Sequence, residues 1–436
     1  MRLTWTDPAD LLPHAFVQAG SDGVPVDDLV ARWSVAGGDP KPPRAGAGPV
    51  APLPLGRLAG DLLDEIDRRS VNAGPALAPV PTVAPLSGRT SADRVRGAWL
   101  GRAIGCVLGK PVEKIPRDGI RAIAEATGNW PITRYFTGVG LPRDIADRWP
   151  WNRRSRTTSL IETMAGIPED DDLNFTLLAL AMVERYGTKL TTADVAQTWL
   201  DNLPAGRVFT AERAAYRNLL LGIEPDRAAM VRNPFREWIG ALIRADFYGW
   251  ARPGDPSGAA RTADADALLS HRGDGVYGAR WVAAMASVAL VADDLSPVLT
   301  AGLSVVPADS RLADAVRFGI DLARRDIGHE RALDELHARY GHLHWVHVVN
   351  NAAVIAYALA STGGDLGPAI AIAVSAGWDT DSAGATVGAI CGALAGAERL
   401  PRSWTDPLDG QFHTTLPGFD GVSVAELTGR TGAVAL

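Results

Sequence analysis

The chain has 436 residues, of which 47% are hydrophobic, and a formal net charge of -7. This length supports one large domain or two of medium size, and the absence of a basic stripe argues against a nucleic-acid-binding surface. The only two cysteines, Cys106 and Cys391, lie in apolar runs rich in Gly and Ala, which predicts small core residues in a reducing compartment. Because no secretory signal pattern begins the chain, we expect a cytoplasmic protein.

Residues 1–90 are predicted to form an appended segment that carries short helices. A helix is expected over residues 9–19, directly after an Asp-Pro pair that is typical of a helix start. Leucines and an isoleucine at helical spacing predict a second helix over residues 55–69. Residues 37–49 are rich in Gly and Pro and residues 71–90 in Pro, Ala and Val, as in linkers.

Residues 91–436 are predicted to form one all-α domain. Apolar residues recur every three or four positions in long windows such as 175–185, and sustained strand-like alternation is absent. The apolar segment 369–397 is not expected to cross a membrane. Asp379 and Asp381 interrupt it and leave about 15 uncharged residues, whereas a spanning helix needs roughly 20.

Two predicted helices carry glycine at every fourth position: Gly97, Gly101, Gly105 and Gly109 in the first, and Gly384, Gly388, Gly392 and Gly396 in the second. A step of four residues rotates by only about 40°, so the glycines of each run share one side of their helix. Each glycine costs about 1 kcal/mol relative to alanine inside a helix. Such repetition needs a compensating reason, and we expect the backbones of two helices to approach closely.

An acid pair stands at the start of the second glycine helix, where Asp379, Asp381 and Ser382 follow Gly377. Buried acids need a positive partner, and Mg²⁺ prefers such oxygen ligands. Side chains two positions apart on a helix point about 200° apart. Asp379 and Asp381 are therefore expected to meet on one ion only in the turn before the helix, which Gly377 would supply. Ser382 is expected to cap the helix or to join the coordination.

A second acidic run, Glu169, Asp170, Asp171 and Asp172, precedes another predicted apolar helix. Acids at this position can simply cap the helix and favour its dipole. Four adjacent carboxylates also repel one another, however, and a bound cation would relieve that repulsion. Together the two acidic sites would offer about five or six oxygens, which suits two Mg²⁺ ions about 3.5–4 Å apart.

Four segments together resemble the ADP-ribosylglycohydrolase family. They are a glycine helix ending in Gly-x-Pro-x-Glu, here residues 109–113, the acidic run 169–172, Ser270-His271, and a Gly-x-Asp-x-Asp motif with its glycine helix, here residues 377–389. The resemblance covers roughly residues 91–400. It implies an all-α fold with a binuclear Mg²⁺ centre, in which Mn²⁺ can substitute.

By this resemblance, the reaction would be hydrolysis of the glycosidic bond of an ADP-ribosyl substrate, or of a related N-ribosyl nucleotide. The implied metal ligands are Glu169, Asp170, Asp171, Asp172, Asp379, Asp381 and Ser382. The implied catalytic residues are Glu113 and Asp171. The implied substrate-binding residues are Gly109, His271, Tyr277 and Gly278.

The chain departs from the family pattern at two places. Its first metal motif lacks the threonine that precedes the paired aspartates, so the pair is either Asp170-Asp171 or Asp171-Asp172. Phe175 favours the second register, because relatives carry an apolar residue four positions after the first aspartate. Cys106 stands where many relatives have aspartate. Both departures bear on the substrate more than on the fold.

Several alternatives stay open at this stage. The enzyme could act on a small nucleotide-derived metabolite, or the protein could bind ADP-ribose without catalysis. A class I terpene synthase also has an aspartate-rich helix motif, but its second metal motif has no good copy here. A zinc site at His344 and His347 is disfavoured, since carboxylates supply the main site. Arg244 and Asp246 are expected to form a structural pair.

Overall fold

The computed structural model describes residues 3–43, 46–70 and 76–435, and the chain divides into two compact units. The first unit comprises Met1–Pro79, Thr191–Ala241 and Ala265–Val276. The second comprises Val80–Leu190, Leu242–Asp264 and Tyr277–Leu436. The predicted organisation, an appended segment 1–90 and a catalytic domain 91–436, stays a prediction.

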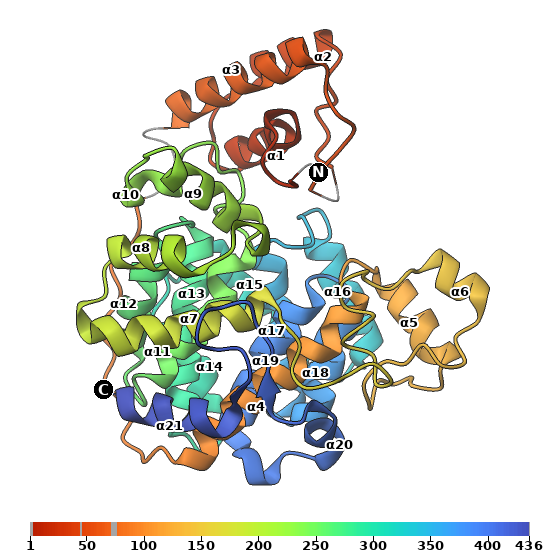
Figure 1. Ribbon diagram of the computed structural model, residues 1–436, viewed down its shortest axis with the longest axis vertical. Helices are drawn as coiled ribbons and strands as arrows, with labels where there is room; N and C mark the ends of the chain where they lie inside the picture. Colours follow the sequence, from red (N-terminus) through yellow and green to blue (C-terminus); the bar gives the residue numbers. More distant parts are fainter. Residues whose placement is uncertain (1–2, 44–45, 71–75, 436) are drawn as a thin grey trace. The chain divides into compact units, whose positions relative to one another are not determined.

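The first unit is helical (Figure 1). Its elements are α1 (Pro8–Ser21), α2 (Asp27–Val35), α3 (Leu53–Ser70), α8 (Thr192–Asn202), η3 (Ala205–Arg207), α9 (Thr210–Leu220) and α10 (Pro225–Ala228). Helices α1 and α3 confirm the two predicted helices, and the Asp7 carboxylate caps α1 by accepting from the Ala9 N–H at 3.0 Å. Helix α2 was not predicted, although Leu29 and Trp33, one turn apart, form its buried face. Residues 44–45 and 71–75 of the predicted linkers lie outside the described residues.

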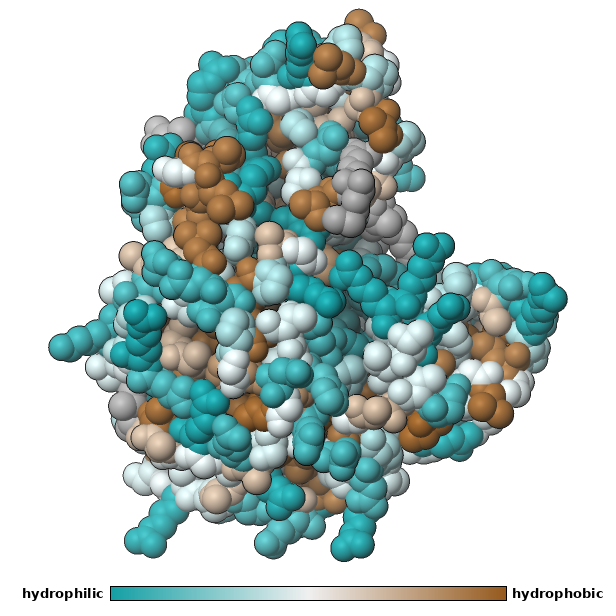
Figure 2. Space-filling model, viewed as in Figure 1, coloured by the Kyte–Doolittle hydropathy of each residue, from teal (hydrophilic) through white to brown (hydrophobic). Residues whose placement is uncertain are grey.

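The surface of the first unit includes an apolar patch over α8–α10 (Figure 2). Leu220 and Leu221 are 67% and 71% exposed there, and Leu200 is 37% exposed. Leu220 ends α9 and Leu221 follows it, whereas Leu200 lies in α8.

The second unit confirms the predicted all-α class. Its elements are α4 (Ala92–Gly109), η1 (Lys110–Val112), α5 (Arg117–Ala126), α6 (Arg143–Arg148), α7 (Asp171–Tyr186), η2 (Gly187–Lys189), α11 (Asp246–Trp250), α14 (Leu295–Ser304), α15 (Arg311–Ala323), α16 (His329–Tyr340), α17 (Val348–Thr362), α18 (Leu366–Ser375), α19 (Thr380–Ala395), η5 (Ala397–Arg399), α20 (Arg402–Thr405), η6 (Asp406–Leu408) and α21 (Val424–Val434). Three elements contribute residues to both units: η4 (Ile239–Arg244), α12 (Pro256–Ala267) and α13 (Asp274–Ala289). The one sheet in the described part of the chain pairs β1 (Gln411–Phe412) antiparallel with β2 (Val422–Ser423).

The two glycine helices, α4 and α19, pack backbone against backbone, as the glycine spacing predicted (Figure 1). A Cβ atom built on Gly101 would lie 2.0 Å from the carbonyl oxygen of Gly388, and one built on Gly105 would lie 1.8 Å from that of Gly384. The contacts run in opposite directions along the two helices, so α4 and α19 are antiparallel. Their alignment brings the end of α4 beside the start of α19, where the acid pair stands.

Segment 369–397 is divided between α18 and α19, with Gly377 in the turn between them. Within the described residues, none of the helices combines the length and the hydropathy that crossing a bilayer requires. Cys106 and Cys391 are both buried and unbonded to each other, which confirms their prediction as small core residues.

Candidate metal centre

The acid pair is presented by the turn that leads into α19. Gly377 has a φ of +71°, as the predicted glycine turn requires, and Asp379 is the N-cap residue. Asp381, which was expected in the turn, lies instead in the first turn of the helix. The two carboxyl groups still come within hydrogen-bonding reach of each other. The backbone of Asp379 is not helical, so the 200° separation expected within a helix does not apply.

The second acidic run is presented by the start of α7. Asp170 is the N-cap residue, and its Oδ1 accepts from the Asp172 N–H at 3.0 Å. Capping is therefore part of the role of Asp170. In addition, Asp170, Asp172 and Asp381 each offer a carboxylate oxygen, and these three oxygens lie within 4.8 Å of one another. The two acidic motifs, about 210 residues apart in sequence, thus form one cluster.

Asp172 is the member of the cluster with an unsatisfied oxygen. Its side chain is buried, its Oδ2 accepts from Ser382 Oγ at 3.1 Å, and its Oδ1 has no hydrogen-bond partner among the described residues. The nearest positive group, the guanidinium of Arg102, lies 3.6 Å from Oδ1. A buried acceptor without a donor is costly, and a cation at this point would satisfy it.

Arg102 supports the cluster from the middle of α4. It is fully buried, and it donates to the backbone oxygen of Asp172 at 2.7 Å and to Asp246 Oδ2 at 2.7 Å. The predicted pairing of Asp246 with Arg244 is therefore replaced by a pair with Arg102. Arg244 instead places its guanidinium 5.1 Å from the ring centre of Phe175.

Lys110 reaches the cluster from the end of α4. Its Nζ lies 2.6 Å from Asp170 Oδ2 and 2.7 Å from the backbone oxygen of Glu169. Burial alone would lower the pKa of the Lys110 ammonium, but the nearby acidic groups, Asp170 first among them, together outweigh this effect and raise the pKa above its ordinary value. Burial likewise favours a higher pKa for Asp170, and Lys110 reverses it, so that the pKa of Asp170 is lowered. The two groups form a buried ion pair.

The pKa values of four other carboxyl groups of the site are shifted upward, in the direction opposite to that of Asp170. Burial first, and the neighbouring carboxylates second, raise the pKa values of Asp171, Asp172, Asp379 and Asp381. Such a concentration of negative charge stabilises a bound cation. The donors are all oxygens, which fits a hard divalent ion such as Mg²⁺.

Glu113 follows η1 and lies close enough to contribute to the raised pKa values of Asp171, Asp379 and Asp381. Its carboxylate accepts from Asn152 Nδ2 and lies 3.0 Å from Lys114 Nζ. The side chain is 19% exposed. Glu113 therefore lies near the cluster and has polar partners of its own.

Glu169 has a different set of partners. Its Oε1 accepts from Asn174 Nδ2 at 3.2 Å and from the Thr415 N–H at 3.1 Å, and Thr415 Oγ1 also donates to it. These contacts tie the start of α7 to the loop after β1. The three clustered carboxylates do not include Glu169, and its role as a ligand stays a prediction.

Comparisons with known proteins identify the family of the chain. The sequence profile of the ADP-ribosylglycohydrolase family matches residues 87–431. The chain belongs to the ADP-ribosylglycohydrolase family. It is 26% identical over 326 residues to an uncharacterised protein of Archaeoglobus fulgidus, a match that covers 73% of this chain and 93% of the relative. It is also similar to a solved ADP-ribosylglycohydrolase-related protein complex, with a TM-score of 0.49, 20% identity, and coverage of 79% of this chain and 96% of the other.

Family membership makes the protein an enzyme that hydrolyses glycosidic bonds. The profile spans both acidic motifs and both glycine helices, so the terpene synthase alternative gains no support.

The proposed substrate-binding residues have clear packing roles. A Cβ atom on Gly109 would lie 2.2 Å from the Thr380 oxygen, and one on Gly278 would lie 2.6 Å from Val348 Cγ2. Tyr277 is 6% exposed, and the Arg280 guanidinium lies 5.4 Å from its ring centre. These contacts explain the residues as parts of the core, and their contact with substrate stays a prediction.

His271 belongs to the first unit and is fully buried. Its Nδ1 lies 2.8 Å from Ser270 Oγ and 3.8 Å from Glu212 Oε1. A role for His271 at the substrate likewise stays a prediction.

Sequence reasoning missed three residues that support the site: Arg102, Lys110 and Asn152. Two of them had a readable signal, because Arg102 is the single charged residue of the glycine-repeat stretch 97–109 and Lys110 directly follows this stretch. Asn152 lies in a loop without regular spacing, and no sequence feature points to its contact with Glu113.

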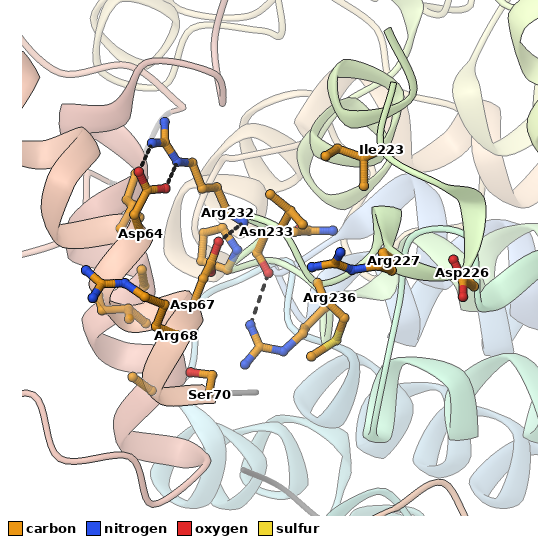
Figure 3. A pocket seen from close by; sticks show the side chains of 17 residues that line it. Asp64, Asp67, Arg68, Ser70, Ile223, Asp226, Arg227, Arg232, Asn233 and Arg236 are labelled. Carbon is orange, nitrogen blue, oxygen red and sulfur yellow. Dashed lines mark hydrogen bonds and ion pairs between the residues drawn. The ribbon is translucent and has the colours of Figure 1, made fainter. Parts of the chain in front are cut away.

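A separate cavity of about 500 Å³ lies within the first unit, between α1, α3 and the segment 223–236 (Figure 3). Its charged groups are largely engaged: Arg232 forms a bidentate pair with Asp64 at 2.7 and 2.6 Å, and its backbone N–H donates to Asp67 at 2.8 Å. None of the clustered carboxylates lines this cavity, so it is not part of the candidate metal centre.

Proposed function

We propose that the protein is a Mg²⁺-dependent hydrolase that cleaves the glycosidic bond of an ADP-ribosyl or related N-ribosyl nucleotide substrate. The observation that carries the proposal is the group of Asp170, Asp172 and Asp381, the last two of them buried, which joins the starts of α7 and α19 in a chain of the ADP-ribosylglycohydrolase family. We propose that Asp171, Asp379 and Ser382 complete the metal site and that Mn²⁺ can replace Mg²⁺.

When bound, the metal would polarise substrate oxygens and lower the pKa of a bound water. The residues of the chain would supply the remaining requirements, which are proton transfer and the stabilisation of positive charge. Glu113, held by Asn152 and Lys114, is the proposed carboxylate that accepts a proton or stabilises positive charge at the anomeric carbon. Asp171 is the second catalytic candidate, because burial and Asp170 raise its pKa and so favour proton exchange.

The proposed substrate contacts are Gly109, His271, Tyr277 and Gly278. ADP-ribose linked to arginine or serine and small ADP-ribosyl metabolites share the ribose and diphosphate. They differ only in the leaving group, so one panel of these compounds distinguishes a protein-directed enzyme from one that acts on metabolites.

The test measures release of ADP-ribose from this panel, with and without Mg²⁺, together with the metal content of the protein. We expect turnover that depends on Mg²⁺ and that falls at least about 100-fold in Asp381→Asn, since a ligand matters at least as much as its outer partners. Asp326→Asn, at an exposed aspartate of the same unit, serves as the control and should keep wild-type turnover. Equal metal content and equal turnover in Asp381→Asn and Asp326→Asn would contradict the proposal.

A further inference from the structure

Lys110 is a cation that the chain itself inserts into the carboxylate cluster. Its side chain is 6% exposed, and a lysine is rarely buried to this extent without a partner. That partner is Asp170, at 2.6 Å, with the backbone oxygen of Glu169 as a second acceptor at 2.7 Å. The ammonium group therefore lies against one of the three carboxylates that could hold a metal ion.

The contact leaves Asp170 with both oxygens engaged. Oδ2 is occupied by Lys110, and Oδ1 accepts from the Asp172 N–H at 3.0 Å as the cap of α7. Asp172 differs, because its Oδ1 has no hydrogen-bond partner among the described residues. The unsatisfied oxygen thus belongs to Asp172, whose carboxylate lies beside that of Asp381, whereas both oxygens of Asp170 already have partners.

The packing of the end of α4 against the start of α19 holds the backbone of Lys110 close to the carboxylate cluster. The residue follows Gly109, whose missing side chain lets the end of α4 approach the first turn of α19: a Cβ atom there would lie 2.2 Å from the Thr380 oxygen and 2.4 Å from the Asp381 nitrogen. Thr380 Oγ1 also donates to the Gly109 oxygen at 2.9 Å. The backbone that carries Lys110 is therefore fixed against the backbone that carries Asp381.

We propose that the Lys110 ammonium takes the place of one metal ion, so that this centre binds one divalent cation per chain, where the sequence motifs predicted two. The inference rests on the proposed function, since it specifies the metal content of the same site. Lys110 would hold Asp170 in position and neutralise it, while the single ion would be bound through Asp172 and Asp381.

The experiment counts Mn²⁺ ions in the whole 436-residue chain by calorimetric titration and by electron paramagnetic resonance, which distinguishes an isolated Mn²⁺ from an exchange-coupled pair. We expect one Mn²⁺ per wild-type chain, with the spectrum of an isolated ion. Lys110→Met removes the charge and frees Asp170, and it should bind a second Mn²⁺ and show exchange coupling. Lys110→Arg keeps the charge and should stay at one.

The matched control is Lys114→Met, at a lysine four residues later that pairs with Glu113 instead of Asp170. It should keep one ion and an uncoupled spectrum. Two coupled ions in the wild-type protein would overturn the inference while leaving the proposed function intact, and so would a folded Lys110→Met variant that still binds one ion. If Lys110→Met does not fold, the wild-type count and spectrum decide between one ion and two. Failure of the proposed function looks different, because neither the wild-type protein nor Asp381→Asn would then bind Mn²⁺ specifically.

Discussion

The packing of α4 on α19 makes a quantitative prediction for Gly101→Ala. An alanine Cβ would lie 2.0 Å from the Gly388 backbone oxygen, whereas ordinary contacts begin at 3.4 Å. The helices would have to separate by about 1.4 Å to restore that distance, and a gap of this size forfeits much of the dispersion energy of the neighbouring contacts. Because the obstacle is backbone and cannot change rotamer, we take the upper end of the overpacking cost, about 3 kcal/mol. Alanine recovers about 1 kcal/mol through its helix propensity.

We therefore expect Gly101→Ala to lower the free energy of unfolding by about 2 kcal/mol. The matched control is Gly429→Ala in α21, where a Cβ atom meets nothing within 4 Å. That change should raise stability by up to about 1 kcal/mol. Urea denaturation, followed through the hydrogen-exchange protection of peptides from α4 and α21, reports on the second unit alone. A Gly101→Ala variant as stable as the wild-type protein would refute the argument from close backbone packing.

Two further predictions concern buried charges. Burial raises the pKa of Asp67 from 3.8 to about 6. As the pH rises from about 4 to 6, Asp67 ionises in the unfolded state before it ionises in the native state, so the native state loses stability over this range. Asp67→Asn can still accept from the Arg232 N–H. It should stabilise the protein by about 2–3 kcal/mol at pH 7 and by little at pH 4, whereas an equal gain at both values would contradict the assignment. Arg102→Met leaves Asp246 without its buried partner and should cost about 3–5 kcal/mol in urea denaturation. By contrast, Arg430→Met, at a partly exposed ion pair, should cost less than about 1 kcal/mol. Similar losses in the two arginine variants would show that burial does not control the effect.

The sequence by itself determined those features that depend on local spacing. Apolar residues every three or four positions predicted the all-α class, and the four-residue glycine repeat predicted the contact of α4 with α19. Both predictions succeed because helical periodicity is a property of a short stretch of chain. The two acidic motifs were found for the same reason, since each consists of neighbouring residues at a helix start.

Only the tertiary structure decided which charged groups meet. Asp246 pairs with Arg102, 144 positions away, and not with its neighbour Arg244, while Lys110 meets Asp170 across 60 positions. Such partners depend on where helices cross, and the spacing of residues within one helix does not contain that information. The position of Asp381 in the helix, and not before it, likewise depended on the cap geometry of Asp379. The sequence thus predicted a metal site and its acidic residues. The structure identified Arg102 and Lys110 as the positively charged side chains that lie against these acids.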